Sequence, residues 1–234
     1  MFDHPNGSDG CRASIWRRIW NKKHTSVDLP LHKLDGFDLL NVEQFNALTQ
    51  PFIKWMEPIV GKDVLEVGCG SGAFLKNIGT PRTFSGIDYS QFAIDRIRKE
   101  IDGTFAVAEA NCLPFAASHF DIVFSFGVFF YFDSLQYAQK CLLEQLRVLR
   151  PGGSIFVFEV NDEDKKALYR QIRSDEPRSR IQQTHLKADH LFYTKDFFYQ
   201  FAQRHNLRCE IRDESEMGIS FHSGASYRYA VKIS

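Results

Sequence analysis

The sequence predicts an α/β fold: a doubly wound, mostly parallel sheet that ends in an antiparallel strand pair and carries an N-terminal helical cap. Two observations predict it. From residue 62 onward, short runs rich in β-branched and aromatic residues alternate with amphipathic stretches, which is the order of βαβ units around a sheet buried on both faces. The last two apolar runs are separated by a short gap, which is typical of antiparallel neighbours.

Residues 1–40 are expected to form a flexible leader and a helical cap. The first twelve residues are rich in Gly, Asp, Asn and Pro, and such a composition buries too little surface to offset the entropy of ordering. Trp16 and Trp20 then fall on one side of a short basic helix. That helix either packs on the core as a cap or covers a ligand as a lid. A second helix is predicted over residues 41–59.

Residues 41–234 are expected to form one domain. Strands are predicted at 64–67, 84–88, 105–109, 121–126 and 154–160, with helices at 73–78, 90–101 and 134–149 between them. A charged, Arg-rich insert, residues 161–193, interrupts the alternation. The chain resumes with a helix that Thr194 is expected to cap, followed by strands at 207–214 and 226–234.

Composition excludes several classes of partner. The chain has 29 basic and 29 acidic residues, so no net field attracts a nucleic acid or an anionic membrane. No apolar run approaches the ~18 residues that span a bilayer, and the N-terminus is polar, so we expect a cytoplasmic protein with no membrane partner. The five scattered cysteines have no metal-ligand spacing and are expected to be reduced thiols, with no metal site. The composition predicts no oligomeric state.

The strongest local signal is VLEVGCGSGAFL, residues 64–75, a strand that leads into a glycine-rich turn. Gly68, Gly70 and Gly72 let the backbone approach a ligand where any Cβ would collide. Asp88 follows Gly68 by twenty residues, so this spacing also satisfies a dinucleotide-binding fingerprint. The motif alone therefore leaves an NAD(P)-dependent oxidoreductase open.

Four landmarks in order carry a family resemblance: VLEVGCGSG (64–72), GIDYS (86–90), AEANCLPF with FDIVFSFGVFFYF (108–132), and LRVLRPGGSIFVFEV (146–160). Over this stretch the chain resembles the class I, Rossmann-like S-adenosylmethionine-dependent methyltransferases that act on small molecules. The resemblance implies S-adenosylmethionine as cofactor, S-adenosylhomocysteine as product and direct in-line transfer. A non-catalytic binding module that keeps the cofactor fold is a further alternative.

The resemblance also implies which residues hold the cofactor. Glu66 and the glycine-rich turn would surround its methionine part. Asp88 would accept both ribose hydroxyls, because a carboxylate takes two parallel O–H donors. Tyr89 would border the adenine, and residues 109–111 occupy the place of the family's Asp-Ala pair near the adenine amine. The full predicted cofactor-binding set is Glu66, Gly68, Cys69, Gly70, Gly72, Asp88, Tyr89, Glu109, Ala110, Asn111 and Phe126.

The acceptor is expected to be a small molecule methylated at oxygen or nitrogen. The sulfonium methyl is already activated, so a base is needed only for a hydroxyl or a protonated amine. Base candidates are Tyr131, His185, His190 and His222, although a solvated or structural role is the commoner one for histidines in such positions.

Two segments bear on the acceptor's chemistry. FSFG (124–127) stands in place of the Asn/Asp-Pro-Pro-aromatic tetrad of enzymes that methylate amino groups of nucleic acids and glutamine, which argues against those acceptors. If the Phe-rich run around it lines the cleft rather than the core, the acceptor has an apolar or planar part. The insert 161–193 is interpreted as an acceptor-binding or lid segment. Its Arg173, Arg178 and Arg180 lie either on a solvated helix face or bind an acidic acceptor.

Overall fold

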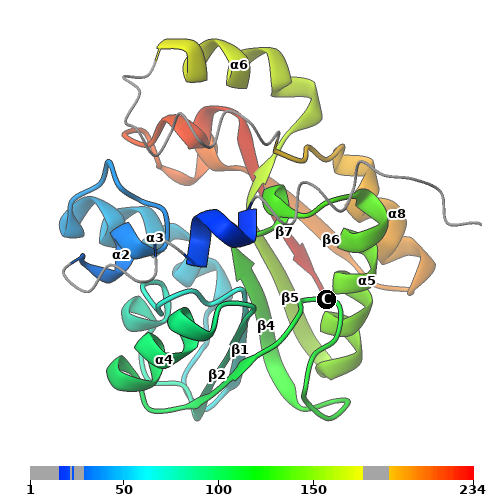
Figure 1. Ribbon diagram of the computed structural model, residues 1–234. Coiled ribbons are helices and arrows are strands. Elements are labelled where there is room, and N and C mark those ends of the chain that lie inside the picture. Colours follow the sequence, from blue (N-terminus) through cyan, green and yellow to red (C-terminus); the bar gives the residue numbers. More distant parts are fainter. Residues whose placement is uncertain (1–15, 22, 24–28, 176–189) are drawn as a thin grey trace, which may run out of the picture.

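The computed structural model describes residues 16–21, 23, 29–175 and 190–234. Its centre is a seven-stranded sheet in the order β3-β2-β1-β4-β5-β7-β6 (Figure 1). The strands are β1 (Asp63–Val67), β2 (Thr83–Asp88), β3 (Thr104–Val107), β4 (Phe120–Phe126), β5 (Leu149–Asn161), β6 (Cys209–Asp213) and β7 (Arg228–Ile233). The first five pair in parallel, whereas β7 is antiparallel to both β5 and β6. The predicted fold class is confirmed.

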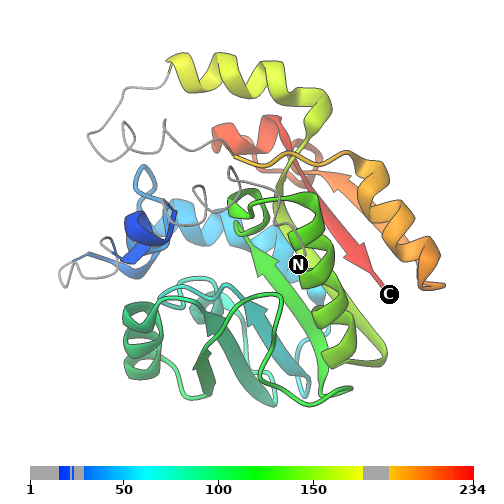
Figure 2. The same ribbon diagram turned by 45° about the vertical axis from the view of Figure 1, so that its right-hand side comes forward.

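Helices cover both faces of the sheet (Figures 1 and 2). The helices α3 (Val42–Met56) and α4 (Gln91–Glu100) pack on one face, and α5 (Leu135–Val148) and α8 (Lys195–Arg204) pack on the other. Along β4, Phe124 belongs to the first hydrophobic cluster and Val123 to the second. This alternation follows from the two-residue period of a strand and explains why the central strands read as continuous apolar runs.

Local capping sets the helix starts. Asn41 Oδ1 accepts from the Gln44 amide at 2.8 Å, and the Gln44 side chain accepts from the Asn41 amide at 3.0 Å, which is a capping box. Ser90 and Ser134 cap α4 and α5 through their side chains. Thr194 is the N-cap residue of α8, as predicted, but its side chain makes no capping hydrogen bond.

Two element predictions are corrected. The helix expected at 73–78 is only a short 3₁₀ turn, η1 (Leu75–Asn77). Its last amides bond three residues back, Asn77 to Phe74 and Ile78 to Leu75, and Pro81 follows closely, so the turn does not continue as an α-helix. Strand β5 begins at Leu149 rather than at 154, because Leu149 already pairs with Phe120 before a register shift.

The cap and the insert lie above the carboxyl ends of the parallel strands. The helical residues 16–21 and α2 (Leu31–Leu34) form the described cap, and the former crosses over the end of the sheet (Figures 1 and 2). The insert contributes η3 (Glu163–Lys165) and α6 (Lys166–Asp175). The predicted leader, His185, Arg178 and Arg180 lie outside the described residues. Short 3₁₀ turns occur at η2 (Phe129–Tyr131), η4 (Glu214–Met217) and η5 (Ser223–Ser226).

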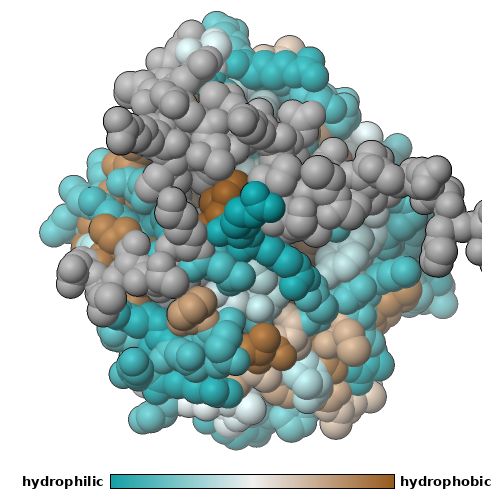
Figure 3. Space-filling model, viewed as in Figure 1, coloured by the Kyte–Doolittle hydropathy of each residue, from teal (hydrophilic) through white to brown (hydrophobic). Residues whose placement is uncertain are grey.

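The face seen in Figure 3 is mostly hydrophilic, and its hydrophobic residues are scattered rather than gathered into one continuous patch. Within the described ranges, no helix has both the length and the apolar character needed to cross a bilayer. The four cysteines of the described part are free thiols, as expected: Cys69, Cys112, Cys141 and Cys209.

Candidate functional site

The glycine-rich turn after β1 is tied to the end of β2. The amides of Gly68 and Cys69 donate to the Ile87 carbonyl at 2.8 and 2.9 Å. Gly68 has φ of +83°, and a Cβ there would lie 2.5 Å from Val128 Cγ2. Gly72 has φ of +91°, and its Cβ would lie 2.7 Å from Ile97 of α4. Both positions therefore require glycine, Gly68 beside the end of β4 and Gly72 for packing against a helix.

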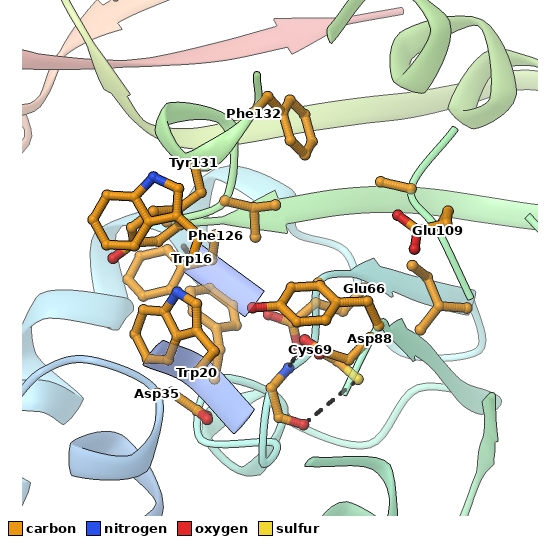
Figure 4. A pocket seen from close by; sticks show the side chains of 18 of the residues that line it. Trp16, Trp20, Asp35, Glu66, Cys69, Asp88, Glu109, Phe126, Tyr131 and Phe132 are labelled. Carbon is orange, nitrogen blue, oxygen red and sulfur yellow. Dashed lines mark hydrogen bonds between the residues drawn. The ribbon is translucent and has the colours of Figure 1, made fainter. Parts of the chain in front are cut away.

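A pocket opens at the carboxyl ends of β1, β2 and β4 beneath the cap (Figure 4). It is lined by nine of the eleven residues predicted to bind the cofactor: Glu66, Gly68, Cys69, Gly70, Asp88, Tyr89, Glu109, Ala110 and Phe126. Gly72 and Asn111 do not belong to this lining. The crevice beyond the strand ends of an open α/β sheet is the usual place for a ligand in this architecture.

Two predicted carboxylates lie in the middle of the pocket. Asp88 is buried, and its oxygens accept from the Gly70 amide at 3.1 Å and the Ser90 amide at 2.8 Å. Glu66 is 2% exposed, and its Oε2 has no hydrogen-bond partner among the described residues. Burial first, and then the negative charges of Asp35 and Asp88, raise the pKa of Glu66 well above its usual range. A buried polar atom without a partner is costly and marks a place where a ligand can pair.

Sequence reasoning missed a third carboxylate, that of Asp35. It follows α2, and its Oδ1 accepts from the Ser71 amide at 2.7 Å while its Oδ2 accepts from the Ala73 amide at 3.1 Å. Asp35 lines the pocket. The only local signal is an Asp-Gly pair at the end of a short helix, which indicates a turn. Nothing in that pattern points to a loop 36 residues further along the chain.

The opposite end of the pocket holds Glu109 (Figure 4). Its carboxylate pairs with Arg17 of the cap and accepts from Tyr137 Oη at 3.2 Å. The Arg17 guanidinium lies 5.1 Å from the centre of the Tyr89 ring. Arg17 and Tyr137 were not predicted as site residues. The ion pair between Arg17 and Glu109 leaves this end of the pocket close to neutral.

Aromatic rings form the wall next to the cap. The Tyr131 ring lies edge-on to Trp16 at 4.6 Å and to Trp20 at 5.4 Å between centroids. Phe37 stacks on Phe126 at 5.3 Å. All five side chains line the pocket, whereas Phe124 and Phe129 of the Phe-rich run belong to the core. The helix at 16–21 therefore both packs on the domain and covers the pocket.

The structure separates the four base candidates. Tyr131 lines the pocket, and burial raises its pKa above the usual range, so its hydroxyl stays protonated at neutral pH. The ring of His190 lies 5.3 Å from Trp16, and its Nδ1 is 3.2 Å from Tyr169 Oη. Neither His190 nor His222 is part of the pocket lining, and His185 lies outside the described residues.

His222 belongs to a buried ionic cluster beside β5. Its Nε2 is 3.6 Å from Glu159 Oε2 and 3.3 Å from Arg228 Nη1. Glu159 has φ of +62° and pairs with Arg228, while its amide donates to Glu214 Oε1 at 2.8 Å. Phe37, whose ring centre lies 6.4 Å from that of His222, stands between this cluster and Phe126. In the described part of the chain, no group of three His, Cys, Asp or Glu side chains is placed to hold a metal ion.

Sequence comparisons relate this chain to known methyltransferases. A family model for a methyltransferase domain matches residues 65–157. Aklanonic acid methyltransferase DauC of Streptomyces sp. is 32% identical over 130 residues, covering 51% of this chain and 57% of that protein. Fatty-acid O-methyltransferase of Mycolicibacterium smegmatis is 32% identical over 136 residues, covering 54% of this chain and 46% of that protein. The chain thus spans about half the length of these relatives.

Among solved structures, the plantazolicin methyltransferase BpumL in complex with S-adenosylhomocysteine has a TM-score of 0.62 at 16% identity, covering 97% of this chain and 98% of that one. A likeness at this identity concerns the fold. The matched family model covers the glycine-rich turn, Asp88 and β4, which line the sheet side of the pocket, whereas the cap lies outside the match. Residues 65–157 therefore match a methyltransferase domain, and the chain has the Rossmann-like fold of a solved methyltransferase complexed with S-adenosylhomocysteine.

Proposed function

We propose that this chain transfers a methyl group from S-adenosylmethionine to an oxygen or nitrogen atom of a small molecule that has an apolar or planar part. The observation that carries the proposal is the buried, unpaired Glu66 oxygen beside the glycine-rich turn, with Asp35 and Asp88 close enough to raise its pKa. S-adenosylmethionine has a sulfonium, an ammonium and one carboxylate, so its net positive charge suits such a site.

The residues of the pocket fit this cofactor. Glu66 and the turn at Gly68–Gly70 would hold its methionine part, and Asp88 would hold the ribose. Tyr89 and Ala110 would border the adenine. The turn fits because a side chain at Gly68 or Gly70 would meet Val128 or Asp35 at 2.5 and 2.4 Å, so only bare backbone lines the pocket there. When bound, S-adenosylmethionine supplies a methyl group on a sulfonium, which needs no further activation.

The chain's contribution is then mainly positioning, which can supply on the order of 7–11 kcal/mol. No histidine of the described residues lines the pocket, and the Tyr131 hydroxyl is protonated at neutral pH. We therefore favour acceptors whose nucleophile needs no strong base, such as a carboxylate, an acidic phenol or a neutral amine. Trp20, Phe37 and Tyr131 would contact the apolar or planar part of the acceptor, and Tyr131 would donate a hydrogen bond to it.

One observation disfavours the oxidoreductase alternative. In dinucleotide-binding folds the amides at the start of the helix after the glycine-rich turn receive a pyrophosphate. Here the Ser71 and Ala73 amides already bond to the Asp35 carboxylate. A pyrophosphate at this position would face Asp35, Glu66 and Asp88, and its negative charges would be repelled.

Two measurements on the full chain test the proposal. Isothermal titration calorimetry should detect binding of S-adenosylhomocysteine but not of NADH; no uptake of the former would refute it. Transfer of radiolabelled methyl groups is then measured to aromatic acids, fatty acids, phenols and aromatic amines, with bulk tRNA for comparison. Label on a small acceptor supports the proposal, and label on tRNA alone overturns the acceptor class. Binding without turnover on any acceptor would favour the non-catalytic binding module.

A further inference from the structure

Asp35 of the cap places its carboxylate against the last amides of the glycine-rich turn. Asp35 accepts from two amides of this turn at 2.7 and 3.1 Å, and it lines the pocket. A Cβ at Gly70 would lie 2.4 Å from Asp35 Oδ1. The close approach of cap and turn therefore depends on glycine at that position.

The position of Asp35 within the pocket identifies the part of a ligand that it meets. Asp35 lies near Trp20 on one side of Glu66, whereas Glu109 lies at the far end beyond Asp88 (Figure 4). Arg17 neutralises Glu109 at that far end. With the ribose on Asp88 and the adenine toward Glu109, the methionine part lies on the side of Asp35 and Glu66.

Two carboxyl groups, those of Asp35 and Glu66, line this end of the pocket. Glu66 Oε2 is buried without a partner among the described residues, and Asp35 adds a second carboxylate within electrostatic reach of it. A carboxylate has about four acceptor positions, so it can accept from several donors at once. An ammonium group carries three donors and no acceptor, and it complements two neighbouring carboxylates.

We propose that Asp35 is a cofactor-selecting residue: together with Glu66 it recognises the α-ammonium group of the cofactor, and by covering the amides of the turn it rejects phosphate at that end. This inference rests on the proposed function, since it assigns a role within the same cofactor site. It predicts that Asp35 takes part in binding the aminoacyl end and takes no part in binding the adenosine.

The test compares two ligands on the full chain by calorimetry at fixed ionic strength. S-adenosylhomocysteine carries the aminoacyl group, whereas 5′-methylthioadenosine shares the adenosine and thioether but lacks that group. The variant is Asp35→Asn, which keeps an acceptor oxygen and removes the charge. Glu43→Gln is the matched control, because Glu43 is an exposed carboxylate at the start of α3 outside the pocket lining. Thermal unfolding without ligand checks that each variant is folded.

Asp35→Asn should weaken S-adenosylhomocysteine binding about tenfold or more, as expected for loss of a charged hydrogen-bond partner. Its affinity for 5′-methylthioadenosine should change less than about twofold, and Glu43→Gln should change neither affinity. An equal loss for both ligands would mean that Asp35 only holds the turn, and no loss for either would mean that it faces no ligand. Each result overturns the inference while leaving the proposed function intact.

The unmodified chain provides a second measurement that does not depend on the variant folding. If Asp35 and Glu66 recognise the ammonium, the wild type binds S-adenosylhomocysteine at least about tenfold more tightly than 5′-methylthioadenosine. Equal affinities would overturn the inference even if Asp35→Asn failed to fold. Failure of the wild type to bind either nucleoside would instead refute the proposed function, and the inference with it.

Discussion

Replacing Glu66 by glutamine tests the electrostatics of the pocket most directly. The substitution keeps the size of a side chain that is 2% exposed and removes one negative charge. Glu66 Oε2 has no partner among the described residues, so the substitution breaks no hydrogen bond of this atom there. A hydrogen bond to a charged group contributes about 1.5–3 kcal/mol, which corresponds to roughly a ten- to hundredfold loss of affinity for S-adenosylhomocysteine.

The raised pKa of Glu66 adds a pH signature to this prediction. Burial and the neighbouring Asp35 and Asp88 raise the pKa of the ligand-free carboxyl well above its usual range. A bound ammonium favours the ionised form, so binding lowers this pKa and releases a proton. Affinity should therefore rise as pH increases through the range between the bound and ligand-free pKa values. Glu66→Gln should remove both the proton release and the pH dependence.

Calorimetry in two buffers of different ionisation enthalpy measures the proton released on binding, and the affinity follows from the same titrations. Glu43→Gln again serves as control, because it removes a carboxylate from an exposed site outside the pocket lining. It should bind S-adenosylhomocysteine as the wild type does. Glu66→Gln binding within about twofold of the wild type, with an unchanged proton count, would refute the reasoning.

Three further predictions concern the frame around the pocket. Arg228→Met removes the guanidinium that pairs with the buried carboxylate of Glu159 and should lower the free energy of unfolding by about 3–5 kcal/mol in urea. Adding Glu159→Gln should recover part of that loss, and an undiminished stability of the single variant would contradict it. Burial and the charge of Glu159 raise the pKa of Glu214 above its ordinary value of 4.5. The folded state therefore retains a proton that the unfolded chain releases, and the free energy of unfolding falls as pH rises above 4.5. Glu214→Gln should flatten this decline and raise the melting temperature at pH 7–8, whereas an unchanged slope would count against a protonated Glu214. Gly72→Ala brings a Cβ to 2.7 Å from Ile97 at a positive φ, whereas Gly61, also at positive φ, has open space around it. Gly72→Ala should therefore lower the free energy of unfolding by about 1–3 kcal/mol more than Gly61→Ala. Equal losses would contradict the packing argument.

The elements most accurately predicted from sequence are those whose signals are local. The period of two in β4 and the period of 3.6 in α5 follow directly from which residues each element buries. The glycine-rich turn and Asp88 are also local, because a tight turn after a buried strand permits few alternatives to glycine. The helix predicted at 73–78 is only a 3₁₀ turn, because its last amides bond three residues back and Pro81 follows closely.

The rest of the site depends on contacts between distant segments. Asp35 and Ser71 are 36 residues apart, and Arg17 and Glu109 are 92 apart. No periodicity connects such pairs, so their partnership emerges only from the tertiary structure. The same holds for the cluster at Glu159, where the left-handed backbone of a non-glycine residue is held in place by buried partners from β7 and η4.

The charged residues of the cap differ between the two ends of the pocket. At one end Arg17 cancels the charge of Glu109, where the proposed ligand presents a neutral adenine. At the other end Asp35 adds a negative charge beside Glu66, where the proposed ligand presents an ammonium and a sulfonium. The β-sheet alone would supply carboxylates at both ends and would distinguish them poorly. Arg17 and Asp35 of the cap thus give the two ends of the pocket different charges. This difference complements the proposed ligand, whose adenine is neutral and whose amino-acid end carries the ammonium and the sulfonium.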